Sequence, residues 1–339
     1  MTDSPHPVNT SPELGAALDA LRNLAGTTAL ALAAPPSPLT GGFWAQMWTL
    51  DLAGTGGAIP DRVVLRLAPN AEHAVWETTV QRAVSEQGFP TPRILVAGAP
   101  TKTTGPWSVM DLAAGHPLMA GLSGAGAIAK LPQLARALPR QLATAAAQLH
   151  ALDPAPVRDA LVAAIGTPVG IDGLIEHLSA RLDAVAASRL RSHLRALVRT
   201  QPSLGSEVVC HGDLHPFNVL IDDGRLTVLD WTAAQIADRE YDLSFTSLLV
   251  STPPLAAPAP MRPAINGAAR WLARRFMKEY ARLAPSHTID GVRLAWYHRL
   301  HVVRILTEVA EWEAVGPIDA HRGHPWLIMR AALERELRG

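Results

Sequence analysis

Three polar side chains in the middle of the chain have the types and the spacing that phosphoryl transfer requires. Asp213 lies five residues before Asn218, and Asp230 follows twelve residues after Asn218. A carboxylate such as Asp213 can accept the proton of a substrate hydroxyl, while the oxygens of Asn218 and Asp230 are hard ligands of the kind that Mg²⁺ prefers. Because phosphoryl transfer depends mainly on positioning and on neutralising charge, this set predicts such a site, with His215 beside the transferred phosphate.

The histidines of the same stretch allow a second hypothesis. Imidazole and carboxylate groups suit Zn²⁺, and His211 and His215 flank Asp213, as in a metal-dependent hydrolase. That interpretation leaves Asn218 and Asp230 without a role, and no further His or Glu follows at ligand spacing. Each polar residue taken singly is typical of a turn that caps strands. The spaced set favours the catalytic interpretation.

Short strands are expected to hold this stretch, because it interrupts a mostly helical part of the chain. Apolar runs at 208–210, 219–221 and 226–229 are of strand type, and polar loops between such strands often carry function. The spacing of Ala and Leu around them predicts helices over 131–152, 171–198, 264–283, 291–315 and 325–337. Glu308, Glu311 and Glu313 are predicted to form a solvated helix face, which would attract a cationic substrate if it pointed inward.

The first third of the chain is predicted to be strand-rich with one or two packed helices. Apolar runs at 45–52 and 61–68 flank a Gly-rich turn at 53–57, the pattern of an antiparallel hairpin. Further strands are expected at 93–97 and 107–112. Helical spacing predicts one helix at 11–24, capped by Ser11 and ended by Gly26, and another at 71–87.

The catalytic stretch resembles the aminoglycoside phosphotransferase family, small-molecule kinases related to the protein kinases. The run His-Gly-Asp-Leu-His-Pro-Phe-Asn at 211–218 and the Asp-Trp pair at 230–231 match the family's catalytic loop and metal-binding segment in order and spacing. The acidic segment at 238–243 is similar to one that follows in the family, with Arg239 where many members have proline. The resemblance implies Asp213 as the catalytic base and Asp242 as a brace for its loop.

The same resemblance implies a fold and a metal site. The expected fold is α+β and protein-kinase-like, with a strand-rich nucleotide-binding lobe over residues 1–112. A mostly helical lobe over 113–339 would then carry the catalytic loop and the substrate site. Asn218 and Asp230 are the implied ligands of Mg²⁺, and ATP or GTP is the implied phosphoryl donor.

Weaker similarity extends over most of the chain. The positions implied to contact the nucleotide are Gly41 and Gly42 in a phosphate-covering loop, Arg66 on the third strand, Glu77 on the next helix, and Met110 and Leu112 at the hinge. The family usually has lysine on the third strand. This chain has only three lysines against 27 arginines, and none of the three falls there. Arginine keeps the charge but is not interchangeable with lysine at a tight site. The macrolide phosphotransferase branch is similar in having arginine in this stretch.

Composition restricts the partners. The chain has 30 basic and 30 acidic residues, which argues against a nucleic-acid backbone or an anionic membrane as partner. The single cysteine, Cys210, forms no internal disulfide and is predicted to be a buried apolar residue, and no secretory signal is recognisable. A cytoplasmic location is expected. The oligomeric state is left open.

The sequence leaves the acceptor open. The hydroxyl of an antibiotic, a macrolide or an aminoglycoside, is the first hypothesis. Choline, an amino alcohol or a sugar is a further alternative. A binding protein that kept the fold without the chemistry is the alternative that Arg66 suggests, although the full set of Asp213, Asn218 and Asp230 argues against it.

Overall fold

The computed structural model describes residues 11–39, 45–118, 126–166, 169–253, 259–316 and 324–338, and of residues 126–134 it describes the backbone alone. The chain divides into two compact units. Unit 1 extends to His116 and also includes residues 155–166 and 220–233, while unit 2 contains the rest of the chain. Each unit is described by itself below.

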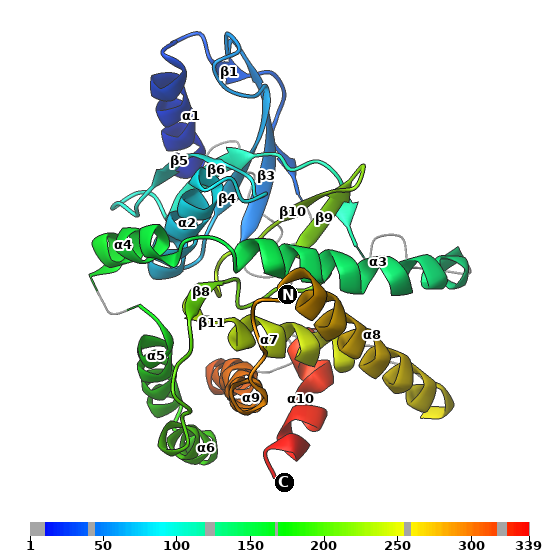
Figure 1. The fold of residues 1–339 in the computed structure, drawn as a ribbon. Coiled ribbons are helices and arrows are strands. Elements are labelled where there is room, and N and C mark those ends of the chain that lie inside the picture. Colours follow the sequence, from blue (N-terminus) through cyan, green and yellow to red (C-terminus); the bar gives the residue numbers. More distant parts are fainter. Residues whose placement is uncertain are drawn as a thin grey trace. The chain divides into compact units, whose positions relative to one another are not determined.

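Unit 1 is built on an antiparallel sheet with the strand order β1-β3-β4-β6-β5, and β2 also pairs with β3 (Figure 1). Its strands are β1 (Ala31–Leu32), β2 (Ser37–Pro38), β3 (Gln46–Ala53), β4 (Arg62–Leu67), β5 (Ile94–Gly98) and β6 (Trp107–Asp111). The predicted hairpin is confirmed as β3 and β4. Because β4 is paired on both edges and is rich in branched apolar residues, it forms the centre of the sheet, and Arg66 is buried in it.

Two helices of unit 1 accompany this sheet, α1 (Pro12–Ala25) and α2 (Ala71–Glu86). The predicted ends of α1 are confirmed, since the Ser11 hydroxyl accepts a hydrogen bond from the Leu14 amide at 3.2 Å and Gly26 is left-handed at φ 65°. Leu14 and Leu21 of α1 pack into the core of the sheet. Asn70 caps α2, which places Glu77 two turns further along this helix.

The remaining elements of unit 1 and the segments at its boundary are short. They are β7 (His116–Pro117), α4 (Pro154–Ile165), β9 (Val219–Asp222) and β10 (Arg225–Val228), and the strands have the order β10-β9-β7. Helix α4 begins shortly after the helix that was predicted over 131–152, and the sequence analysis did not predict it.

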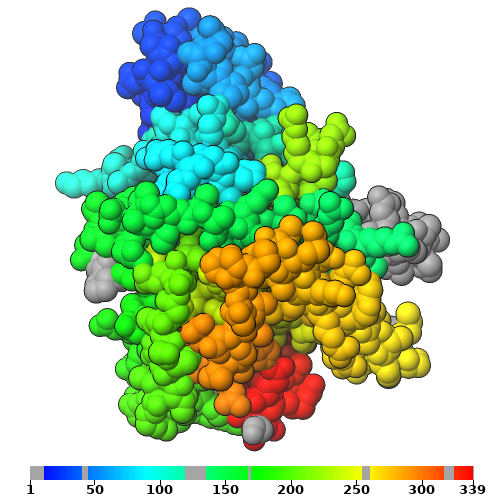
Figure 2. Space-filling model, in the orientation of Figure 1, coloured from blue at the N-terminus to red at the C-terminus, as the bar shows by residue number. Residues whose placement is uncertain are grey.

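Unit 2 is mostly helical, with one two-stranded antiparallel sheet. Its elements are α3 (Gly126–Leu149), α5 (Ile171–Ala184), α6 (Ser188–Arg199), β8 (Glu207–Cys210), β11 (Gln235–Asp238), α7 (Arg239–Ser251), a 3₁₀ turn at Ala259–Met261, α8 (Arg262–Leu283), α9 (Gly291–Val315) and α10 (Pro325–Glu336). Helix α8 buries a single stripe that includes Phe276 and Tyr280. Most of the rest of its surface is exposed, and much of it is visible in yellow and gold in Figure 2.

One sequence prediction in unit 2 needs correction, and two elements of this unit were not predicted. The helix expected over 171–198 is two helices, α5 and α6, because Ala186 adopts a left-handed conformation at φ 52° and turns the chain between them. The acidic segment at 238–243, to which the sequence assigned no secondary structure, lies in strand β11 and helix α7, in which Asp238, Glu240 and Asp242 are all buried. Hydrophobic periodicity cannot indicate such elements, because it assigns charged residues to the surface.

Among the helices of the described ranges, none combines the length and the apolar character needed to cross a membrane.

Candidate active site

The loop after β8 places Asp213 in unit 2. The Asp213 amide donates to His211 Nδ1 at 3.2 Å, and the Asn218 side-chain amide donates to the Asp213 carbonyl at 3.0 Å and to its Oδ2 at 3.4 Å. His215 Nε2 lies 3.5 Å from the same Oδ2. The structure therefore brings Asp213, His215 and Asn218 together as one group on a single turn of chain.

The Asp213 carboxylate has one oxygen left for a reaction. Oδ1 is buried and makes no hydrogen bond within the described part of the chain, whereas Oδ2 is engaged by its neighbours. Burial alone would raise the pKa of Asp213, but the positive field of His215, Arg304 and His211 outweighs it, so the pKa lies below its usual value. The group is therefore an ionised carboxylate with a free acceptor oxygen, which a general base requires.

Asp242, at the start of α7, holds the backbone of this loop. Its Oδ2 accepts from the His211 amide at 2.8 Å and its Oδ1 accepts from the Gly212 amide at 2.6 Å. His150 Nε2 is 3.1 Å from Oδ2, and His150 Nδ1 is 2.8 Å from the Tyr280 hydroxyl. Although burial raises it, these hydrogen bonds and the His150 contact lower the pKa of Asp242 overall. Both loop amides are thus fixed by a buried carboxylate.

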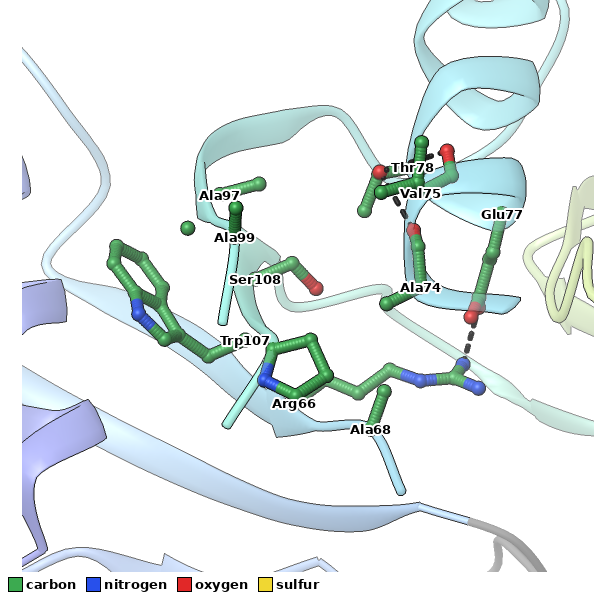
Figure 3. Close-up of a pocket in the computed structure, with 12 residues that line it drawn as sticks. Arg66, Ala68, Ala74, Val75, Glu77, Thr78, Ala97, Ala99, Trp107 and Ser108 are labelled. Atoms are coloured by element: carbon green, nitrogen blue, oxygen red, sulfur yellow. Dashed lines mark hydrogen bonds and ion pairs between the residues drawn. The ribbon is translucent and has the colours of Figure 1, made fainter. Parts of the chain in front are cut away.

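Unit 1 contains an ion pair between the central strand and helix α2. Arg66 Nη1 contacts Glu77 Oε1, and both side chains are almost completely buried (Figure 3). Burial raises the pKa of Glu77 and the negative charge of Asp230 adds to that rise, whereas Arg66 opposes it and favours the ionised carboxylate of the pair. The pair forms part of the wall of a cavity of about 90 Å³ beside α2 and the strands β5 and β6.

Asp230 follows β10 in unit 1 and is held in a left-handed conformation, at φ 64°. Its Oδ1 accepts from the Thr232 hydroxyl at 2.7 Å, so Oδ2 remains for another partner. The next residue, Trp231, anchors the segment because its ring is fully buried, lies edge-on to Phe89 and donates from Nε1 to the Thr91 hydroxyl at 3.0 Å. The strained backbone thus presents Asp230 at a defined position after the strand.

Comparison with known proteins identifies the family. A model of the family described as "Phosphotransferase enzyme family" matches residues 37–286. The chain belongs to this family. An aminoglycoside 3'-phosphotransferase of Streptomyces fradiae is 30% identical over 267 residues, which cover 73% of this chain and 87% of that protein.

Solved structures of phosphotransferases share the fold. The macrolide 2'-phosphotransferase MphH from Brachybacterium faecium has a TM-score of 0.52 at 21% identity, covering 92% of this chain and 98% of its own. A thermostable mutant of the aminoglycoside phosphotransferase APH(4)-Ia, in a ternary complex with AMP-PNP and hygromycin B, has a TM-score of 0.53 at 19% identity, covering 89% and 95%. The predicted α+β, protein-kinase-like fold is confirmed.

Other predicted positions of this phosphotransferase can now be placed. Gly41 and Gly42 lie outside the described residues. Met110 is on β6, 3.9 Å from the Gln81 side-chain amide of α2, and Leu112 follows that strand and is 38% exposed. Cys210 is fully buried, as predicted.

The Zn²⁺ hypothesis finds no support in the geometry. Within the described part of the chain, the potential ligand atoms that converge within 4.8 Å belong to His150, Cys210 and Asp242, all buried. His211 Nδ1 and His215 Nδ1 instead accept hydrogen bonds from the amides of Asp213 and Phe217, both at 3.2 Å.

Sequence reasoning missed part of the surroundings of Asp213. Among the glutamates expected on a solvated face, Glu313 is exposed, but Glu308 is half-buried and accepts from the Trp326 indole at 2.8 Å. Glu311 is half-buried too, in a two-bond pair with Arg181 at 2.7 and 2.5 Å. The field of Asp213 raises the pKa of Glu308, behind the larger effect of burial, so α9 brings this carboxyl near the loop. The available signal in the sequence was the i, i+3 spacing of Glu308 and Glu311, which places both side chains on one face of the helix.

Proposed function

We propose that this protein transfers the γ-phosphoryl group of ATP or GTP to a hydroxyl of a small molecule. The observation that carries the proposal is the ionised Asp213 carboxylate, with one oxygen engaged and the other free, on a loop whose amides are fixed by Asp242. Such a carboxylate can accept the proton of an acceptor hydroxyl as the oxygen attacks phosphorus. The family to which the chain belongs supports the same reaction.

Other side chains, on the same loop and in unit 1, have supporting roles in this proposal. His215, 3.5 Å from Asp213 Oδ2, would lie beside the transferred phosphate and add to the positive field. In unit 1, Arg66 replaces the family's lysine, and its pair with Glu77 orients the guanidinium through Nη1 while Nη2 can bind a phosphate oxygen. Met110 and Leu112 remain the proposed contacts with the purine base of the nucleotide. Gly41 and Gly42 remain the proposed phosphate-covering loop.

The donor set fits Mg²⁺. Asn218 uses its side-chain N–H groups to bind Asp213, which leaves its carbonyl oxygen as a ligand, and Asp230 keeps Oδ2 free. Both are hard oxygens of the kind that Mg²⁺ takes together with substrate phosphates. When bound, the ion would supply neutralisation of phosphate charge.

The acceptor is proposed to be an antibiotic of the macrolide or aminoglycoside type. The relatives support this class by name. Around the loop, Glu311 is neutralised by Arg181, whereas Glu308 keeps a carboxyl oxygen beyond its indole hydrogen bond. This balance suits an acceptor hydroxyl that lies near one ammonium group better than a dense polycation, since each unpaired ammonium needs its own carboxylate.

A panel assay tests the proposal. Purified protein with Mg²⁺ is incubated with ATP or GTP and a set of acceptors: aminoglycosides, macrolides, choline and sugars. Formation of an O-phosphorylated antibiotic is the expected result. A phosphorylated metabolite alone would overturn the antibiotic assignment, and the absence of nucleotide stabilisation in a thermal-shift measurement would favour a binding protein without the chemistry.

A further inference from the structure

Arg304 of α9 reaches the catalytic loop from a different element. It is 8% exposed, and its Nη2 donates to the Gly212 carbonyl at 2.6 Å. Its Nη1 donates to the Tyr241 hydroxyl at 2.7 Å, and its guanidinium carbon lies 4.4 Å from the centre of the Phe245 ring. A long, rotamer-rich side chain is thus fixed in one orientation by three contacts within unit 2.

The charge of Arg304 is not used for an ion pair. In the ranges that the structure describes, no carboxylate oxygen lies within 4.0 Å of its guanidinium, and its partners are a carbonyl, a phenol and aromatic faces. Arg304 lies in the negative fields of Asp213 and Glu308 without contacting either carboxylate, and burying a cation without a direct ionic partner is costly. Hydrogen bonds from a charged donor and the cation–π contact offset part of that cost. The arrangement therefore favours a role at the Gly212 carbonyl.

That carbonyl belongs to the peptide that leads into Asp213. Gly212 is left-handed at φ 73°, and because glycine lacks a Cβ its backbone has a wider choice of conformations than that of any other residue. The Gly212 amide is fixed by Asp242 Oδ1 and the Asp213 amide by His211 Nδ1. Arg304 fixes the remaining polar atom between them, the Gly212 oxygen. With all three atoms held, the backbone from which the Asp213 side chain projects is fixed, and Asn218 and His215 engage the carboxylate itself.

We propose that Arg304 is a positioning residue for the phosphotransferase reaction: it holds the Gly212–Asp213 peptide by its carbonyl and so directs the Asp213 carboxylate. Tyr241 assists by holding the guanidinium, while its neighbour Asp242 holds the amides of the same turn. The inference rests on the proposed function, in which Asp213 is the base.

The test compares variants of the full chain. Arg304→Met keeps the approximate length of the side chain without its donors, Arg304→Lys keeps the charge without the planar fork that reaches both oxygens, and Arg299→Met is the control on the exposed face of the same helix. For each variant, kcat of Mg-ATP turnover with and without the best acceptor, KM for ATP and hydrogen exchange of the loop amides are measured.

If Arg304 positions the base, both substitutions lower kcat by about 10²-fold, because small misplacements of a catalytic group have effects of that size, while KM for ATP stays within about threefold. Hydrogen exchange in residues 211–214 becomes faster, and free guanidinium restores part of the activity of Arg304→Ala. Arg299→Met behaves as wild type. A folded Arg304→Met with wild-type kcat would overturn the inference, as would a loss that appears only in KM.

Two further variants keep the result decisive. If Arg304→Met does not fold, Tyr241→Phe removes one holding contact and retains the ring; an unchanged kcat in this variant would also count against the inference. Asp213→Asn separates the two proposals. If Asp213→Asn is fully active the proposed function fails, whereas an inactive Asp213→Asn beside an unaffected Arg304→Met refutes the positioning role alone.

Discussion

Arg66 on β4 and Glu77 on α2 form a buried ion pair in unit 1, with the two side chains 10% and 5% exposed. The pair answers a question raised by the composition of the chain, which has 27 arginines and three lysines. If Arg66 were exposed on the surface, the choice of arginine over lysine at this position would have no expected effect on function. We propose that this buried arginine, which pairs with the helix glutamate, takes the role of the family's lysine and binds phosphate through its second terminal nitrogen.

Replacing Arg66 with lysine tests this role. Lysine is a point charge without the planar fork, so in Arg66→Lys the cation can satisfy Glu77 or phosphate but not both in the same geometry. We expect KM for ATP to rise by about tenfold, which corresponds to a loss of about 1.4 kcal/mol of binding free energy through the missing charged hydrogen bond. The unfolding free energy should change little. Steady-state kinetics at saturating acceptor measures the change in KM.

Arg93→Lys is the matched control, because Arg93 pairs with Asp111 on the same sheet but is 65% exposed. Its KM should not change. An Arg66→Lys enzyme with equal or better activity would mean that arginine at this position reflects only the general bias of the sequence.

The Asp242 brace predicts a coupled loss of stability and rate. Asp242 accepts from two backbone amides and contacts His150 while buried, so Asp242→Asn turns an N–H group towards a donor and leaves buried groups unpaired. We expect a loss of about 3–5 kcal/mol in unfolding free energy, measured by urea denaturation, together with a fall in kcat. The exposed Asp222→Asn should change stability by less than about 0.5 kcal/mol. A similarly small change in Asp242→Asn would refute the brace.

His301 predicts a pH dependence of stability. It is fully buried between the rings of Tyr241 and Phe245, and its Nε2 is 2.8 Å from the Tyr241 carbonyl, to which it donates. Burial, reinforced by the positive charge of Arg304, holds its pKa well below the usual 6.5. Because the unfolded chain binds this proton and the folded chain does not, its contribution to stability is complete above the unfolded pKa and is lost as pH falls below it.

The measurement is urea denaturation of wild type and His301→Gln across this range. The wild type should lose up to about 1.4 kcal/mol more per pH unit than the variant below about pH 6.5. The glutamine side-chain amide can keep the donation to the Tyr241 carbonyl. Parallel curves for the two proteins would show that His301 does not carry the effect.

The position of Glu308 predicts selectivity for the acceptor. If its free carboxyl oxygen binds an ammonium group near the reacting hydroxyl, Glu308→Gln should raise KM for an amine-bearing acceptor by about tenfold and leave a neutral acceptor unaffected, because a charged hydrogen bond contributes about 1.5–3 kcal/mol. Glu313→Gln, on the exposed part of the same helix, is the control. Equal effects on charged and neutral acceptors would contradict this role.

The sequence predicted the residues of the catalytic loop better than the residues from other elements that hold this loop in place. Residues 211–218 are contiguous, so Asp213, His215 and Asn218 come together on one turn as their spacing indicated. Arg304 reaches Gly212 in the loop from 92 residues away, and His150 reaches Asp242, which holds the loop, also from 92 residues away. No periodicity encodes such contacts, since they depend on how α3 and α9 pack.

The main errors in secondary structure have a similar cause. β11 and α7 carry charged residues that are buried because they bind one another and the loop, as Tyr297 binds Asp238 at 2.8 Å. The break between α5 and α6 has neither Gly nor Pro, the residues that normally indicate one. By contrast, the longer strands β3, β4, β5 and β6 and the ends of α1 follow local signals and were predicted correctly, whereas the two-residue strands β1 and β2 were not predicted.

If Asp213 is the base of a Mg²⁺-dependent phosphotransferase, the Asp213→Asn variant must transfer phosphate slowly. Asparagine keeps the size and the hydrogen bonds of the side chain but cannot accept the proton. We expect a fall in kcat of about 10³-fold with unchanged thermal stability and unchanged stabilisation by Mg-ATP. An Asp213→Asn protein that transfers phosphate to its acceptor at the wild-type rate would contradict it.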